Sequence, residues 1–345
     1  MAPNVLVVRN DKIGDFMLAW PALACLKSAL PCPRVSVLVP AYTAELARAC
    51  PWVDEVIIDP GPKADTPAQA ALLASVKAKR FDALLTLFST PRIGWLGFRA
   101  RIPLRLAPAT KWAQLFYTVR ITQRRSRSEK PEYQYNVDLA CALLERLSLK
   151  LAYLPAPPFW PLAPAARESA RQALADPQSS AVVIHPGSGG SAVNLAIEQY
   201  ARLAADVAQR CEHSLAWWVS AGPGEEAKAD ALVDDLTALG VEARRLPPST
   251  SVTAFAHQLA GADLLIAGST GPLHIAGCLN VATAGFYPAK RSATPLRWQT
   301  CNDADKRLAF SPPAGAAHHD MTAIDLAAAA EEISAQLRAG LTTHP

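Results

Sequence analysis

Short apolar runs alternate along the chain with longer segments whose apolar residues recur at helical spacing. Residues 4–8 (NVLVV) and 35–39 (VSVLV) are rich in β-branched residues and predict buried strands. The same pattern predicts further strands over 55–58, 82–88, 181–184, 215–219, 264–267 and 281–286. Helical spacing predicts helices over 16–30, 43–49, 67–79, 133–149, 197–210, 226–239, 253–259, 273–279 and 322–339. This alternation predicts an α/β fold with parallel sheets and crossover helices.

A proline-rich segment divides this alternation into two halves. Residues 155–164 read PAPPFWPLAP, and proline both lacks an N–H donor and resists helix formation. We therefore expect two Rossmann-like domains, residues 1–160 and 165–325, and a C-terminal helix and tail at 326–345 that packs back on the N-terminal domain. The length of 345 residues fits two domains. Open α/β sheets bind ligands at the carboxyl ends of their strands, so the loops there are the candidate sites.

Composition excludes several classes of protein. Half of the residues are hydrophobic, which excludes a disordered or fibrous chain. The seven cysteines contain no C-x-x-C pair, so neither a disulfide framework nor a zinc site is predicted. No apolar run approaches the roughly 18 residues of a membrane span, and Arg9, Asp11 and Lys12 interrupt any export signal. These features predict a cytoplasmic protein with reduced thiols.

The net charge of +4 is unevenly distributed. Residues 92–130 contain ten basic residues and one acidic residue, so this stretch carries +9 and the rest of the chain carries −5. Such a concentration indicates an anionic partner, which the charge alone leaves as a phosphorylated glycolipid, a membrane surface or nucleic acid. A solvated basic loop is the alternative. Aromatic residues are interleaved in the stretch, but no nucleic-acid motif accompanies them.

The loop after the first strand reads RNDKIGD (9–15) and ends in a carboxylate. Gly14 permits a tight turn, and Asp15 then falls at the start of a helix. Asp15 is either a helix N-cap or a general base that takes a proton from an attacking hydroxyl. Neither G-x-G-x-x-G nor a Walker pattern is present.

Two glycine- and serine-rich loops follow strands in the second half. The first reads HPGSGGS from His185, and the second reads GSTGPLH and ends in His274. Exposed backbone N–H groups and hydroxyls suit an anion, so together the loops predict a nucleotide diphosphate site. A mobile surface loop and a buried structural histidine are the alternatives. Glu225, beyond the strand at 215–219, either accepts from ribose hydroxyls or begins a helix with a favourable charge.

Five segments, in this order, make the chain similar to a known family. They are RNDKIGDFMLAWPAL (9–23), RRSRSEKPEYQYNVDL (124–139), HPGSGGSAVN (185–194), STGPLHIAG (269–277) and FYPAKRSATPLRW (286–298). The combination resembles glycosyltransferase family 9, the bacterial heptosyltransferases of lipopolysaccharide core assembly. The resemblance implies a GT-B fold, in which two Rossmann-like domains face an interdomain cleft. It further implies that the N-terminal domain presents the acceptor and the C-terminal domain holds the nucleotide sugar.

The resemblance also implies a reaction. It is the inverting, metal-independent transfer of a heptose from ADP-heptose to a lipopolysaccharide inner-core acceptor, at the cytoplasmic face of the inner membrane. The protein would be peripheral there, with no cofactor and no nucleic-acid partner. Asp15 matches the general base. The expected donor-binding residues are Gly187, Ser188, Gly189, Glu225, Ser269, Thr270, Gly271, His274 and Lys290.

The resemblance further implies that basic residues of the N-terminal half bind the phosphates and carboxylates of the acceptor. They are Lys12, Arg92, Arg124, Arg125 and Arg127. The chain departs from the family at Val193, where many members have a lysine or arginine, and at Ser269, where many have aspartate. Lys290 or Arg291 is predicted to replace the missing cation. The departures leave two alternatives, a member that uses another nucleotide sugar and a non-catalytic binding protein with degenerate donor loops.

Overall fold

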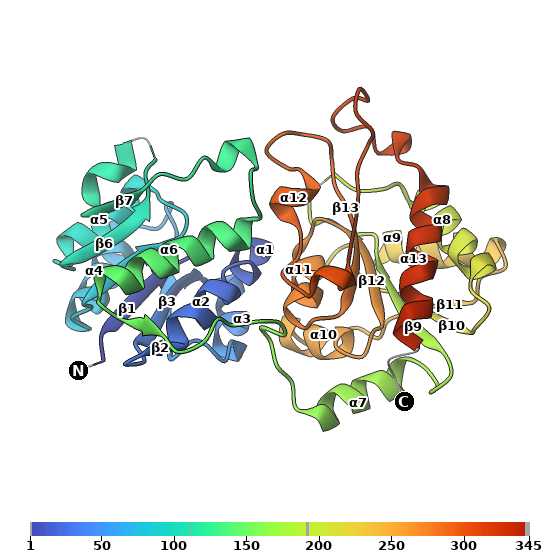
Figure 1. The fold of residues 1–345 in the computed structure, drawn as a ribbon, viewed down its shortest axis with the longest axis horizontal. Helices are drawn as coiled ribbons and strands as arrows, with labels where there is room; N and C mark the ends of the chain where they lie inside the picture. The colour runs from blue at the N-terminus through green and yellow to red at the C-terminus, as the bar shows by residue number, and fades with distance from the viewer. Residues whose placement is uncertain (1, 111, 191–192, 342–345) are drawn as a thin grey trace. The chain divides into compact units, whose positions relative to one another are not determined.

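The computed structural model describes all residues except 1, 111, 191–192 and 342–345, and it divides into two compact units (Figure 1). The N-terminal unit contains residues 1–125 and 130–159. The C-terminal unit contains residues 126–129 and 160–345, so the division falls inside the proline-rich segment. No helix among the described residues is both long enough and apolar enough to cross a membrane.

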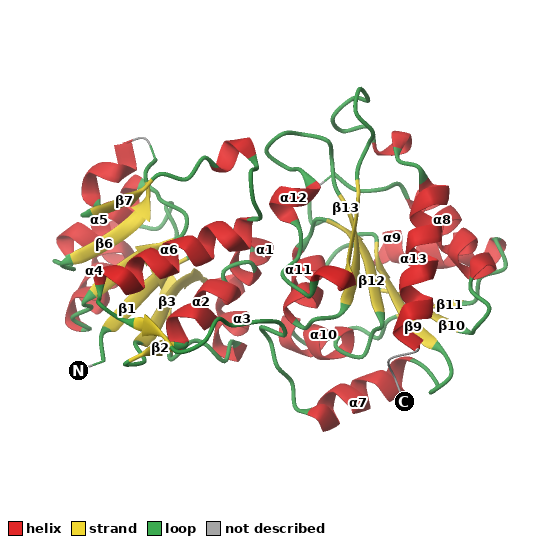
Figure 2. Ribbon diagram, viewed as in Figure 1, coloured by secondary structure: helices red, strands yellow, loops and turns green. Residues whose placement is uncertain are grey.

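The N-terminal unit is built on a parallel sheet of strand order β4-β3-β1-β5-β6-β7 (Figure 2). Its strands are β1 (Asn4–Val8), β3 (Arg34–Pro40), β4 (Glu55–Asp59), β5 (Ala83–Thr86), β6 (Leu104–Pro108) and β7 (Val119–Ile121). The small strands β2 (Ala29–Leu30) and β8 (Lys150–Leu151) form a separate antiparallel pair. The central strand β1 buries side chains on both faces, as expected of a parallel strand covered by helices on both sides.

Helices cover both faces of this sheet. On one face α4 (Thr66–Ala78) and α5 (Pro91–Arg99) form a hydrophobic cluster with β1. Elsewhere in the unit α2 (Trp20–Lys27) packs against α6 (Glu132–Arg146). The shorter elements are α1 (Ile13–Met17), α3 (Ala44–Ala49) and the 3₁₀ turns Ala41–Thr43, Trp112–Phe116 and Arg125–Arg127.

The first helix differs from the sequence prediction. A single helix over 16–30 was expected, but α1 ends at Met17 and α2 begins at Trp20. Pro21 is the cause, because it has no N–H to donate to the preceding turn and is tolerated only in the first turn of a new helix. The break leaves α1 as a short helix that follows the 9–15 loop.

The C-terminal unit repeats the plan with a parallel sheet of order β11-β10-β9-β12-β13-β14. Its strands are β9 (Ser180–His185), β10 (Leu215–Val219), β11 (Ala243–Arg245), β12 (Leu264–Gly268), β13 (Ala282–Phe286) and β14 (Arg307–Phe310). Its helices are α7 (Pro164–Leu174), α8 (Ile197–Arg210), α9 (Glu226–Ala238), α10 (Val252–Leu259), α11 (Gly271–Cys278), α12 (Pro295–Trp298) and α13 (Leu326–Leu341), with 3₁₀ turns at Ala304–Lys306 and Met321–Ala323.

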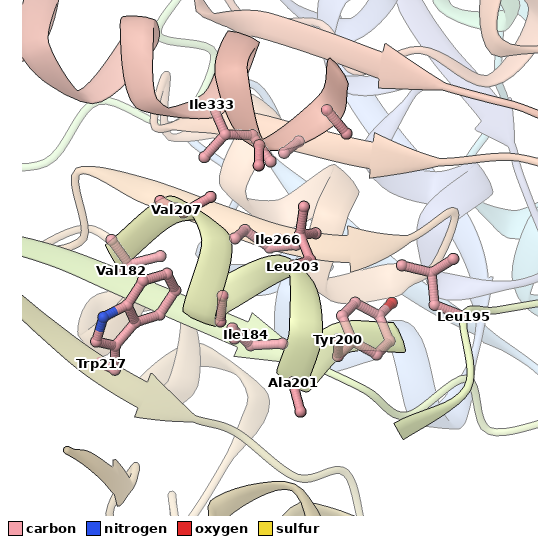
Figure 3. Close-up of a cluster of buried hydrophobic side chains, with 14 of the residues drawn as sticks. Val182, Ile184, Leu195, Tyr200, Ala201, Leu203, Val207, Trp217, Ile266 and Ile333 are labelled. Carbon is pink, nitrogen blue, oxygen red and sulfur yellow. The ribbon is translucent and has the colours of Figure 1, made fainter. Parts of the chain in front are cut away.

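The C-terminal helix α13 belongs to the core of this unit. Ile333 of α13 lies in the same buried cluster as Leu203 and Val207 of α8 (Figure 3). The sequence interpretation placed this helix on the N-terminal domain, whereas its apolar face packs on α8 and closes the C-terminal core. A stripe of apolar side chains predicts that a helix is buried but does not identify the surface that buries it.

Candidate functional site

Arg9 organises the loop that follows β1. The guanidinium is buried and donates through Nε to Asp11 Oδ1 (2.8 Å), through Nη1 to Glu132 Oε1 (3.0 Å) and through Nη2 to Asp15 Oδ1. Burial disfavours the charged form, but the three surrounding carboxylates outweigh it and raise the pKa of Arg9. The loop is therefore held by a permanent cation among three acids.

Asp15 orients toward Arg9 and caps no helix. Helix α1 begins at Ile13 with Lys12 at the N-cap position, and Asp15 lies inside the first turn with its carboxylate partly exposed. The N-cap alternative is therefore wrong. An oriented, partly exposed carboxylate is what a general base for a hydroxyl requires.

Asp11 is a titratable neighbour that sequence reasoning did not select. Burial, with a further contribution from Asp15, raises the pKa of Asp11 to about 6 even though Arg9 lowers it. Its position two residues after Arg9 in the same loop was visible in the sequence. The signal that distinguishes it, close packing with Asp15 and Arg9, appears only in the fold.

Two of the expected acceptor-binding cations already have carboxylate partners. Arg92 Nη2 pairs with Asp59 at the end of β4, and Arg125 Nη1 donates to Glu132 Oε1 (2.6 Å). Burial would raise the pKa of Asp59, but Arg92, Asn10 and a backbone N–H outweigh it, so the pKa is lowered. Both arginines thus have a structural role in the N-terminal unit.

The other three expected cations are less constrained. Lys12 and Arg124 are exposed, and neither pairs with a carboxylate in the described part of the chain. Arg127 belongs to the segment 126–129 of the C-terminal unit, where it lies 3.7 Å from Glu129. The structure therefore does not gather the five residues into one cluster within one unit.

The two glycine–serine loops lie side by side at the carboxyl ends of the strands of the C-terminal sheet. They follow β9 and β12, which are neighbouring parallel strands, so both leave the sheet at its carboxyl end. Asn194 joins them: its Nδ2 donates to Pro186 O (2.9 Å) and Gly187 O (3.2 Å), and a Cβ on Gly268 would overlap its side-chain oxygen. Sequence reasoning did not select Asn194, which ends the quoted motif HPGSGGSAVN.

Glu225 occupies the backbone donors of the first loop. Its Oε1 accepts from the N–H groups of Ser188 and Gly189, each at 2.8 Å. The approach is close enough that a Cβ on Gly187 would lie 2.5 Å from Glu225 Cδ, and Gly189 adopts a φ of +53°. Burial would raise the pKa of Glu225, but the two N–H donors outweigh it and the pKa is lowered. The N–H pair expected to bind phosphate thus binds an anion in this structure, a carboxylate of the chain itself.

His185 lies behind this contact. Its Nδ1 is 3.0 Å from Ser220 Oγ and its Nε2 is 3.9 Å from Glu225 Oε2. Burial lowers the pKa of His185 to about 4, despite the nearby Glu225, so the ring is neutral at pH 7. Neither His185 nor Ser220 was singled out from the sequence, although His185 begins the first loop motif.

The second loop presents unsatisfied polar atoms at the start of α11. Thr270 is the N-cap residue, yet its side chain makes no capping hydrogen bond. Thr270 Oγ1 and, one turn later on the same face, His274 Nδ1 are buried without a hydrogen-bond partner among the described residues. Burial lowers the pKa of His274 to about 4, so the ring is neutral. Buried polar atoms without partners at a helix N-terminus fit an anionic ligand.

The remaining residues expected to bind the donor follow neighbouring strands of the C-terminal sheet, at the carboxyl ends of these strands. Ser269 and Gly271 flank Thr270 and are partly exposed, and Val193 is a half-buried residue that packs on the apolar core. Lys290 is exposed in the turn beyond β13, the neighbour of β12, and pairs with no described carboxylate. Residues 191–192 of the first loop lie outside the described residues.

Comparison with known proteins identifies the class to which this arrangement belongs. A Haemophilus influenzae protein described as a glycosyltransferase is 44% identical over 317 residues, which is 90% of each chain. Escherichia coli ADP-heptose lipopolysaccharide heptosyltransferase II matches with a TM-score of 0.72 at 16% identity over 98% of each chain. A family 9 glycosyl transferase from Veillonella parvula matches with a TM-score of 0.74 at 15% identity, over 99% of this chain and 97% of that one. The protein is therefore a glycosyltransferase with the GT-B fold of two Rossmann-like domains.

The family follows from a second comparison. The model of glycosyltransferase family 9 (heptosyltransferase) matches residues 69–317, well over half of the chain. The chain belongs to glycosyltransferase family 9. The segment 9–23, which carries Asp15, lies before the matched range.

Proposed function

We propose that this protein transfers a heptose from ADP-heptose to an anionic lipopolysaccharide inner-core acceptor, with inversion and without a metal ion. Family membership supports a sugar transferase, and the E. coli heptosyltransferase WaaC, solved with ADP, has the same fold (TM-score 0.72 at 17% identity, 96% of this chain and 99% of that one). The donor half of the proposal rests on two loops on neighbouring strands. One presents anion-binding N–H groups, and the other presents Thr270 Oγ1 and His274 Nδ1, which are buried without a hydrogen-bond partner among the described residues.

The donor would bind through its diphosphate. The Ser188 and Gly189 N–H groups, the α11 N-terminus and Lys290 supply positive potential, and Thr270 and neutral His274 supply hydrogen-bond donors. Glu225 leaves the amides as the phosphate arrives and its carboxylate then accepts from ribose hydroxyls. These groups stabilise the charge that develops on the departing ADP, which is the role of a preorganised oxyanion site.

The acceptor hydroxyl would be activated by Asp15. The hydroxyl oxygen attacks the anomeric carbon, the bond from that carbon to the phosphate oxygen breaks, and the hydroxyl proton passes to the Asp15 carboxylate. A single displacement of this kind inverts the anomeric configuration. Arg9 holds Asp15 in place, and exposed Lys12 and Arg124, with Arg92, Arg125 and Arg127, supply charge for the acceptor.

A transfer assay with ADP-heptose and a truncated inner-core acceptor tests the base. We expect Asp15→Asn to lose at least a hundredfold in kcat, the range in which removal of a general base falls. Asp11→Asn is the matched control, because it removes a neighbouring carboxylate that also contacts Arg9. A parental rate in Asp15→Asn, or loss only in Asp11→Asn, would contradict the assignment.

Binding calorimetry tests the donor. ADP should bind in preference to UDP if the sugar carrier is ADP. A preference for UDP would instead support a family member with another nucleotide sugar, which the uncharged Val193 and Ser269 favour as the alternative. Absence of nucleotide binding would support a non-catalytic binding protein. We propose that the protein works in the cytoplasm, peripherally at the inner membrane, where such an acceptor is anchored.

A further inference from the structure

Helix α5 directs large aromatic side chains toward solvent. Its Ile93 and Leu96 are buried in the N-terminal core, whereas Trp95 and Phe98 on another face are 46% and 50% exposed. Core-facing helices normally place charged residues on their outer face, so two half-exposed rings here need an explanation. The rings stack on one another with centroids 5.6 Å apart.

The 3₁₀ turn Trp112–Phe116 extends this apolar surface. Phe116 packs edge-on against Trp95 at 5.7 Å and lies so close to α5 that a Cβ on Gly94 would approach its Cβ to 2.8 Å. From the same turn, Trp112 and Leu115 project into solvent, at 79% and 66% exposure. We call these four exposed side chains and the basic residues beside them the docking surface. It comprises Trp95, Phe98, Trp112, Leu115, Lys77, Arg99, Arg101 and Arg105.

Those basic residues surround a cavity next to the rings. Lys77, Arg99, Arg101 and Arg105 line an open cavity of about 600 Å³, whose other walls are apolar and include Phe98. Arg99 lies over the Trp95 ring at 5.4 Å and Arg105 over the Phe98 ring at 5.9 Å. No carboxylate lines the cavity, and none of the four cations pairs with a described carboxylate. The lining of the cavity therefore combines positive charge with apolar side chains.

We propose that this surface docks the protein on an anionic phospholipid membrane. Trp112 and Leu115 enter the interfacial region together with the half-exposed rings of Trp95 and Phe98, because aromatic and aliphatic side chains partition to that depth. The cavity then receives a lipid phosphate, and the surrounding cations draw the protein to the negatively charged leaflet. The proposal rests on the proposed function only in that a membrane-anchored acceptor gives such docking a purpose.

The chemistry of the surface favours a membrane over nucleic acid. Base stacking needs open aromatic faces, which Trp112 offers, but the Trp95 ring is already stacked on Phe98 and contacted by the Arg99 guanidinium. The exposed Leu115 side chain can neither stack on a base nor hydrogen-bond to it, but it can insert among lipid acyl chains. Exposed apolar groups beside cations that have no described carboxylate partner match an acyl–headgroup boundary.

Sedimentation with vesicles tests the proposal. The intact 345-residue chain should bind vesicles of phosphatidylcholine and phosphatidylglycerol at low salt and should bind pure phosphatidylcholine at least tenfold more weakly. Trp112→Ser with Leu115→Ser, and separately Arg99→Gln with Arg101→Gln, should each weaken binding to the anionic vesicles at least tenfold. These side chains are mostly on the surface, and circular dichroism will show whether each variant is folded.

Two matched variants of the same unit serve as controls. Tyr153→Ser with Leu154→Ser removes apolar side chains that are 57% and 74% exposed, and Arg146→Gln with Lys150→Gln removes two exposed cations. Both controls should bind within twofold of the parent. Equal losses in the control variants, no parental binding to anionic vesicles, or full competition by a DNA oligonucleotide would overturn the membrane assignment.

A transfer assay with a soluble, lipid-free acceptor separates this proposal from the proposed function. The docking-surface variants should retain parental kcat on that acceptor and lose rate only on acceptor embedded in vesicles. A protein that binds vesicles as expected but transfers no sugar would leave the docking surface intact and reject the proposed function. Loss of rate on the soluble acceptor would assign these residues to the acceptor site and overturn docking.

Discussion

The contact between the Glu225 carboxylate and the first donor loop leads to a counterintuitive prediction. If its carboxylate occupies the Ser188 and Gly189 N–H groups that a phosphate needs, removing it should improve phosphate binding. Glu225→Ala should therefore bind inorganic pyrophosphate more tightly than the parent. ADP should gain less, or lose affinity, because Glu225 also accepts from ribose in the proposed complex.

The expected size follows from the two hydrogen bonds. Hydrogen bonds to a charged group contribute about 1.5–3 kcal/mol each when buried. Gly189 is exposed and Ser188 only partly buried, so water competes and about 1 kcal/mol each is the appropriate figure. The phosphate must displace both bonds, at a cost of about 2 kcal/mol, which corresponds to roughly a 30-fold change in dissociation constant.

Isothermal titration with pyrophosphate and with ADP measures the effect. Glu226→Ala is the matched control, since it removes the same charge from the adjacent, exposed residue. Both variants relieve the same long-range repulsion of an anion. If pyrophosphate gains no more in Glu225→Ala than in Glu226→Ala, the carboxylate does not compete for the phosphate site.

Gly187→Ala perturbs the same contact without changing any charge. The added Cβ would lie 2.5 Å from Glu225 Cδ, so the carboxylate must leave the amides while the flexible side chain absorbs the displacement. This variant should also bind pyrophosphate more tightly, and it should keep more of its ADP affinity than Glu225→Ala because the carboxylate remains available for ribose. A weakened affinity for pyrophosphate in Gly187→Ala would refute the reasoning.

Two further predictions concern stability. Arg9→Met leaves buried carboxylates without their cation and should lower the free energy of unfolding in urea by about 3–5 kcal/mol. The loss should be smaller at pH 5 than at pH 8, because the carboxylates can protonate at pH 5. An equal loss at both pH values would contradict this. The folded-state pKa of about 4 for His185 and for His274 lies below the unfolded value of 6.5, so these residues contribute stability above pH 6.5 that is lost as pH falls toward 4. The melting temperature of His274→Asn should therefore depend less steeply on pH between 4 and 6.5 than that of the parent. Asp11, whose raised pKa has the opposite effect, is present in both proteins and cancels in the comparison. An equal dependence of the two melting temperatures on pH would show that His274 is not buried as a neutral ring.

The sequence predicted most central strands of both sheets and the edge strand β4, but it missed β6 and the edge strands β7, β11 and β14. Central parallel strands such as β1 and β9 are buried on both faces and read as continuous apolar runs. The edge strands β7 and β11 have three residues each, include arginines, and each pairs with a single neighbouring strand. Their own composition carries no strand signal, so only the tertiary structure defines them.

The donor loops could be located from the sequence, but their internal contacts could not. Glycine and serine after a buried strand predicted an anion site, and the loops do lie on neighbouring strands. That Glu225 would fill this site depends on contacts between residues 37 positions apart. The same holds for Arg9 and Glu132, which are 123 positions apart, because the sequence shows each charge but not its partner.

The basic stretch 92–130 illustrates why pairing matters more than net charge. From the sequence its cations form one group, and Arg92 and Arg125 were expected to bind acceptor together. In the fold these two pair with Asp59 and Glu132, carboxylates that lie outside the stretch and were not counted with it. Arg99, Arg101 and Arg105 remain without a described carboxylate partner beside exposed aromatic rings. A paired arginine can bind a new anion only by sharing or exchanging its partner, whereas an unpaired one attracts it directly. The docking surface and Arg124, which has no described carboxylate partner, are therefore available to attract anions directly, whereas any acceptor contact by Arg92 or Arg125 must compete with a carboxylate of the protein.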